Sequence, residues 1–180
     1  PLFIASLCGV FTSYFFFGSE VLIPMTITHA FSLQGIPFYI LLGIVGGLMS
    51  AYFTFVYEKI NAFFNKITAP YLKIVIGGAL LGLLIYIMPP LYGEGHEIIN
   101  HLKEGHPELS LSKNIFGWDL SNMWIIILLL AGLTFAKVVA TSLTFGGGGV
   151  GGIFSPMLFM GGVMGNCFAR IINEFPILGY

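Results

Sequence analysis

The sequence predicts an all-α, polytopic transmembrane protein, and three observations support that prediction. The chain has 180 residues, of which 57% are hydrophobic and only 8% are charged, whereas a typical soluble domain has roughly 25% charged residues. Five stretches contain no Asp, Glu, Lys or Arg: residues 1–19, 21–57, 74–93, 120–136 and 138–169. These stretches are continuously apolar rather than alternating, which favours membrane helices over a β-barrel.

Turn and cap residues place the spans within these stretches. A bilayer core about 30 Å thick needs about 20 helical residues. Pro37 lies at the start of the second span, Pro70 just before the third, and Pro156 in the first turn of the fifth. Met88-Pro89-Pro90 ends the third span. Ser121-Asn122 is a candidate N-cap for the fourth. Apolar residues at helical spacing predict that the second helix continues through Phe64. The expected spans are residues 2–17, 37–57, 71–88, 122–143 and 154–172.

The charged residues predict the orientation in the membrane. Lys59 and Lys66 lie between the second and third spans and Lys73 lies at the start of the third, and the positive-inside rule makes that short loop cytoplasmic. Residues 89–119 hold five of the eight acidic residues and are expected to form an extramembrane loop on the opposite face. The formal net charge is −1 and the sequence contains no basic stripe, so no nucleic-acid partner is expected. The expected location is a cell membrane, as a multi-pass integral protein with lipid as its surroundings.

The most unusual segment runs from Phe145 to Pro156 and reads FGGGGVGGIFSP. Six of the seven residues from 146 to 152 are glycine, and the segment lies inside an uncharged stretch. Irregular backbone at membrane depth is tolerated only where it is buried in protein or lines a polar cavity, because each unpaired backbone group in hydrocarbon costs several kcal/mol. The segment therefore predicts a broken or re-entrant helix, a feature typical of transporter sites.

A helix that begins near Phe154 has anion-binding properties at its start. Its first N–H groups lack helical partners, and its macrodipole places about half a positive charge there. Glycine permits close approach of the backbone, and Pro156 loses only an N–H that would be unpaired. No Arg lies in the segment, which disfavours phosphate and carboxylate and favours a monatomic anion such as chloride. The candidate anion-binding residues are Gly151, Gly152, Ile153, Phe154, Ser155 and Pro156.

Other interpretations stay open at this point. The glycine run is also compatible with a plain connector or a close-packing surface. A nucleotide site is disfavoured, because no strand precedes the run and no P-loop lysine follows it. Lys137 lies in the middle of the fourth span, where it either raises the local potential for anions or satisfies backbone carbonyls. His96, His101 and His106 are best explained as loop residues, so no metal site and no cofactor are expected. No catalytic constellation is readable, and the chain is not expected to be an enzyme.

Gly152-Ile153-Phe154-Ser155-Pro156 resembles the G-x-F-x-P signature of the CLC family of voltage-gated chloride channels and chloride/proton antiporters. Tyr92-Gly93-Glu94-Gly95-His96-Glu97-Ile98-Ile99 is similar to the Gly-x-Gly turn that opens a short helix in the second half of that fold. The resemblance covers essentially the whole chain. It implies a partial inverted-repeat fold, a homodimer with one anion pathway in each subunit, and chloride as the transported ligand.

The resemblance also implies roles for individual residues. The amides of Ile153 and Phe154 would bind the central chloride, and Gly151 and Gly152 would shape the turn. The family's two hydroxyl ligands and its gating and proton-transfer glutamates have no matching motifs here, so we expect a fragment of a CLC-type transmembrane domain that does not transport alone. Channel and antiporter remain undecided. The rival hypotheses are a cation-coupled secondary transporter of another family, disfavoured because no acid interrupts the central parts of the spans, and a non-transporting membrane scaffold.

Overall fold

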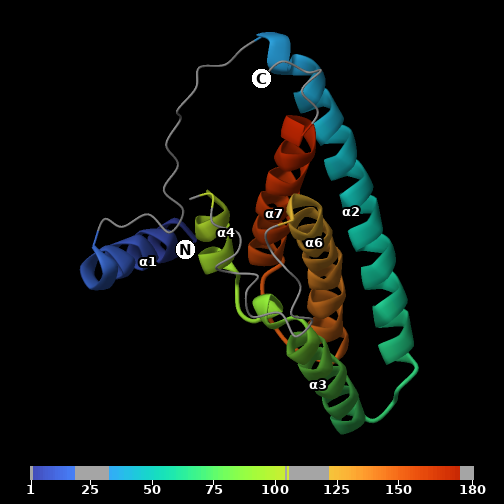
Figure 1. Cartoon of the computed structure of the whole chain (residues 1–180). Helices are drawn as coiled ribbons and strands as arrows, with labels where there is room; N and C mark the ends of the chain where they lie inside the picture. The colour runs from blue at the N-terminus through green and yellow to red at the C-terminus, as the bar shows by residue number, and fades with distance from the viewer. Residues whose placement is uncertain (1, 19–32, 104, 106–121, 175–180) are drawn as a thin grey trace. The chain divides into compact units, whose positions relative to one another are not determined.

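The structure is a computed structural model that describes residues 2–18, 33–103, 105 and 122–174. All regular elements in those ranges are helices, as the sequence predicts (Figure 1). The chain divides into two compact units, Pro1–Ala30 and Phe31–Tyr180. The first contains α1, and the second contains the remaining elements. These elements are α1 Leu2–Phe17, η1 Leu33–Gly35, α2 Ile36–Asn65, α3 Pro70–Ile87, η2 Pro89–Leu91, α4 His96–Lys103, α6 Met123–Gly146 and α7 Phe154–Glu174.

Three helices among the described residues are long and apolar enough to cross a membrane: α2, α3 and α6. This finding, together with the family assignment below, establishes a multi-pass integral membrane protein. Helix α2 has 30 residues and continues past the expected span end at Tyr57 through Phe64, as the apolar residues at helical spacing predict. Helix α1 has the expected bounds, but at 16 residues it is shorter than these three, and whether it crosses the membrane stays a prediction.

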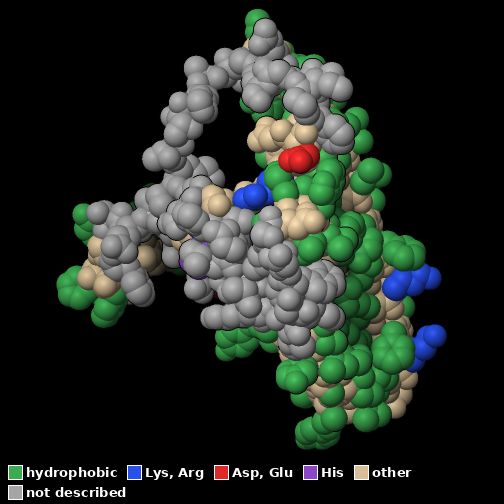
Figure 2. Space-filling view, viewed as in Figure 1, with side chains coloured by type: hydrophobic (Ala, Val, Ile, Leu, Met, Phe, Trp, Pro, Cys, Tyr) green, Lys and Arg blue, Asp and Glu red, His purple; other side chains and the backbone are tan. Residues whose placement is uncertain are grey.

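Helix α6 is the centre of the second unit and contacts α2, α3 and α7 (Figure 1). Its side chains Leu130, Leu133 and Val138 are fully buried, as are Phe159 and Val163 of α7. Outward-facing side chains of α2 and α3 are mostly exposed and apolar, and hydrophobic side chains cover much of the described surface in Figure 2. The Lys and Arg side chains on the right of that view lie over the lower part of α2. Such an apolar exterior suits a lipid environment.

Residues 89–103, the first part of the expected extramembrane loop, contain the short helix that the resemblance implies after the Gly-x-Gly turn. They form η2 and α4, and Leu91, Ile98, Ile99 and Leu102 are buried. Helix α4 packs on α7, and η2 packs on α3 and α6. The apolar residues of α4 recur at helical spacing and give it one buried face, which a count of acidic residues does not reveal. The rest of the expected loop, residues 104 and 106–119, lies outside the described residues apart from Gly105.

The N-terminus of α6 provides a local test of the fold. Asn122 has extended backbone and its Oδ1 accepts the Trp124 N–H at 3.0 Å, which makes it the N-cap that the sequence predicts. We expect Asn122→Ala to destabilise the protein by about 1 kcal/mol, because one amide of the first turn loses its acceptor. Asn122→Asp keeps the acceptor and should be close to wild type. Chemical denaturation in detergent measures both, and equal stabilities for the two variants would contradict the cap.

Candidate functional site

The glycine run breaks the chain between α6 and α7, as predicted, and the carbonyl end of α6 is closed. The N–H of Gly148 donates to Phe145 O at 3.0 Å, and the N–H of Gly149 donates to Thr144 O at 2.8 Å. Gly148 has a φ of 95°, which L side chains rarely adopt. These bonds and this conformation form a Schellman motif, the commonest glycine-based helix stop. The last-turn carbonyls are therefore already paired with glycine amides.

The amide end of α7 is open by contrast. The first helical bond joins the Met157 N–H to Ile153 O at 3.1 Å. No acceptor is recorded among the described residues for the N–H groups of Ile153, Phe154 and Ser155. The Ser155 Oγ is buried and also lacks a hydrogen-bond partner within the described part of the chain. The helix dipole adds positive potential at this point, so this end of α7 offers unpaired donors rather than acceptors.

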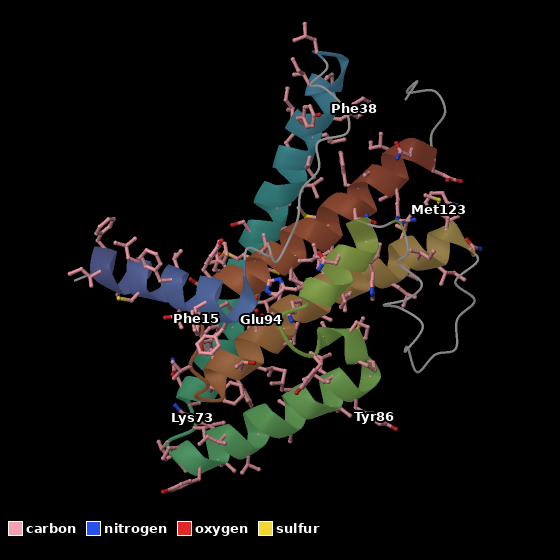
Figure 3. All side chains as sticks on the ribbon, turned by 90° about the vertical axis from the view of Figure 1, so that its left-hand side faces the viewer. Phe15, Phe38, Lys73, Tyr86, Glu94 and Met123 are labelled. Atoms are coloured by element: carbon pink, nitrogen blue, oxygen red, sulfur yellow. The ribbon has the colours of Figure 1, made fainter. Side chains whose placement is uncertain are left out.

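Several glycines around the break are required by close packing. A β-carbon at Gly77 of α3 would lie 2.7 Å from the Cα of Gly147, and one at Gly146 would lie 2.5 Å from the Phe64 ring. Real β-carbons do not approach other atoms so closely, so α2 and α3 pack against the end of α6 through glycine. Figure 3 labels Lys73 at the start of α3, beside this region. At Gly151 and Gly152, a β-carbon would meet nothing within 4 Å.

Lys137 lies on α6 and is 5% exposed. Its Nζ donates to Gly93 O at 2.7 Å and to Leu91 O at 3.1 Å, and it sits 4.8 Å from the centroid of the Phe159 ring. The sequence left two roles open for Lys137, and the structure shows the one in which its ammonium group satisfies backbone carbonyls. Glu94, labelled in Figure 3, pairs instead with His96, whose Nε2 lies 2.8 Å from its Oε2. An electrostatic effect of Lys137 on anions stays a prediction.

Comparison with known proteins identifies the family. The profile described as "Voltage gated chloride channel" matches residues 1–179, which is nearly the whole chain. The chain belongs to this family. Its similarity to the CLC proteins, predicted from the G-x-F-x-P residues, is thereby confirmed. Because α2, α3 and α6 have membrane length and the described elements are all helical, the chain also has the all-α character expected for a part of the CLC fold.

Several curated relatives are similar at low identity. An uncharacterized protein of Methanocaldococcus jannaschii is 27% identical over 97% of this chain and 40% of its own length. The voltage-gated ClC-type chloride channel ClcB of Citrobacter koseri is 23% identical, over 95% of this chain and 37% of its own. The H(+)/Cl(-) exchange transporter ClcA of Vibrio campbellii is 30% identical, over 84% and 30%. The chain thus spans less than half of the length of these relatives. No solved structure gave a significant match.

Within this CLC chain, the structure brings together residues that sequence reasoning did not connect. Gly95 has a φ of 82°, and a β-carbon there would lie 2.1 Å from the Phe159 ring. From the sequence, Gly95 is recognised only as part of a Gly-x-Gly turn, and nothing there connects it with Phe159. Phe159 is fully buried and sits against Lys137 and Gly95. The signal in the sequence is the pair of glycines on either side of Glu94, which marks a turn but does not identify Phe159 as the partner of Gly95.

Proposed function

We propose that this chain contributes the chloride-binding helix start of a CLC-type anion pathway. The ligands are the main-chain N–H groups of Ile153 and Phe154, with the turn shaped by Gly151 and Gly152. Ser155 and Pro156 complete the first turn of α7. The native protein, by which we mean the longest natural form that contains residues 1–180, would move chloride across the membrane. It would do so as a homodimer and without a cofactor. Whether it acts as a channel or as a proton-coupled exchanger is not part of the proposal.

The proposal rests on a difference in hydrogen bonding between the two helix ends at the glycine break. The carbonyl end of α6 is closed by Gly148 and Gly149, whereas the N–H groups of Ile153 and Phe154 have no acceptor among the described residues. A site with unpaired N–H groups and a positive dipole end selects an anion over a cation. Several neutral donors also suit a transported ion, because conduction requires binding that is weak enough for release. The names of the relatives, which include a chloride channel and a proton/chloride exchanger, agree with this chemistry.

Bromide tests the proposal directly, because it substitutes for chloride and scatters anomalously. Crystals of the native protein grown in bromide should show an anomalous peak within hydrogen-bond distance of the Ile153 and Phe154 nitrogens. Crystals grown in chloride and measured at the same wavelength are the control. A bromide data set with no peak at this turn would contradict the proposal and would favour a membrane scaffold or a transporter of another ion.

A further inference from the structure

We propose that Lys137 is a positioning residue, which clamps α4 and α7 to α6 and thereby fixes where the free amides at the start of α7 lie. This inference rests on the proposed function, because its consequence is measured as anion affinity. The clamp consists of Lys137 on α6, the turn of residues 91–95 before α4, and Phe159 on α7. Its members come from three segments that are far apart in the sequence.

The ammonium of Lys137 makes the first connection. Its two hydrogen bonds end on carbonyls of the turn, and its third neighbour is the Phe159 ring. Lys137 is nearly buried and Phe159 fully buried, so these contacts are shielded from water. Charge-assisted hydrogen bonds and a desolvated cation–π contact are stronger than their exposed counterparts. A single side chain therefore ties the turn and α7 to α6.

Gly95 makes the second connection, because its missing β-carbon leaves the space that the Phe159 ring fills. Two more contacts continue along the same pair of helices. A β-carbon at Gly162 would lie 3.5 Å from Ile99, and the Asn166 Nδ2 donates to Leu102 O at 3.2 Å. Residue numbers rise together along both helices, so α4 runs parallel to α7 and supports it over three successive turns.

The glycine-rich connector explains why such a clamp is needed. Residues 147–153 join α6 to α7, and side chains at Gly151 or Gly152 would meet nothing within 4 Å. Val150 is fully exposed, so the middle of the connector is not packed against the rest of the described chain. Glycine backbone has the greatest conformational freedom. A connector of this kind does not fix the depth of α7, which depends instead on the packing of α7 against α6 and α4. The contacts from Lys137 through Phe159 are the part of that packing that joins all three helices.

Two substitutions separate positioning from a direct effect of charge. Lys137→Met removes both the charge and the clamp, whereas Gly95→Ala leaves every charge in place and drives a methyl group into the Phe159 ring. If Lys137 acts by positioning, each variant should weaken chloride binding by about tenfold in calorimetry on the native protein, a change of about 1.4 kcal/mol. The double variant should be little worse than either, because both break the same clamp.

Matched controls complete the test. Gly105 also has a φ of 82° but open space at its β-carbon position, so Gly105→Ala carries the backbone strain without the collision and should leave affinity unchanged. Adding Phe159→Leu to Gly95→Ala makes room for the methyl group, but it also removes the ring that Lys137 faces, so it should restore folding and at most part of the affinity. If Gly95→Ala alone does not fold, the comparison of two substitutions of Lys137 carries the test. Lys137→Gln, which keeps an N–H donor without charge, should bind chloride better than Lys137→Met.

The possible results divide as follows. Wild-type affinity in folded Gly95→Ala, or identical losses in Lys137→Gln and Lys137→Met, would overturn the positioning role and assign Lys137 to electrostatics. If Gly95→Ala does not fold, the comparison of Lys137→Gln with Lys137→Met alone decides between the two roles. The proposed function fails separately, when removal of the Phe154 amide leaves chloride affinity unchanged. Loss of affinity on removing that amide, with no effect at Gly95, would retain the anion site and reject only the clamp.

Discussion

Replacing Gly77 by alanine is expected to destabilise the protein by about 1–3 kcal/mol, the usual cost of overpacking a tight contact. A β-carbon at Gly77 would lie 2.7 Å from the Cα of Gly147 and 3.3 Å from Leu143 O. Both neighbours are backbone atoms, which do not rotate away, so α3 and the end of α6 must separate. Small residues at helix contacts in membranes allow this close approach, and their replacement removes it.

The neighbouring residue provides the control for this prediction. Gly78 occupies the same helix, and a β-carbon there meets nothing within 4 Å. Gly78→Ala and Gly77→Ala gain the same helix propensity, about 0.5–1 kcal/mol in favour of alanine. Gly78→Ala should therefore be neutral or slightly stabilising, and the difference between the variants isolates the contact. Thermal and denaturant unfolding in detergent measure it, and equal stabilities would show that α3 does not pack against Gly147 as the structure has it.

Helix boundaries and the break itself were predictable, because local residues determine them. Asn122 offers a side-chain acceptor for the first turn of α6, Pro70 occupies the first turn of α3, and Pro89 comes just after Met88, the C-cap of α3. The glycine run predicts an interruption because no uniform helix accommodates so many glycines cheaply. The run could not show which glycine takes the left-handed conformation. Four consecutive glycines from Gly146 to Gly149 are equivalent in sequence, and the geometry selects Gly148.

Contacts between distant residues could not be predicted in the same way. Lys137 bonds to carbonyls 44 and 46 positions away, and backbone carbonyls leave no side-chain signature in a sequence. The acidic residues of 89–119 suggested a solvated loop, yet Ile98, Ile99 and Leu102 bury one face of α4. The fit of Gly95 to the Phe159 ring likewise depends on how α4 lies against α7. The sequence therefore predicted the helix break at the glycine run, whereas the contacts that hold α4 and α7 around it required the structure.

Removing the Phe154 amide is expected to have the largest effect on anion binding. Phe154 is the first residue of α7, a position where proline is tolerated because its missing N–H has no helical partner. Phe154→Pro should thus preserve the helix while deleting one proposed chloride donor. The expected loss of binding free energy is about 1–3 kcal/mol, or roughly 5- to 150-fold in Kd, because the bound chloride loses the Phe154 N–H and no water takes its place.

Phe154→Ala separates the amide from the aromatic ring. The Phe154 side chain is 78% exposed in this chain, so its ring makes few contacts here, and alanine keeps the N–H in place. Chloride titration calorimetry on the native protein should give a Kd for Phe154→Ala within a few-fold of wild type and a much weaker one for Phe154→Pro. Equal losses in both variants would assign the effect to the ring. No loss in a folded Phe154→Pro protein would remove the amide from the site, and with it the reason that an anion binds where α7 begins.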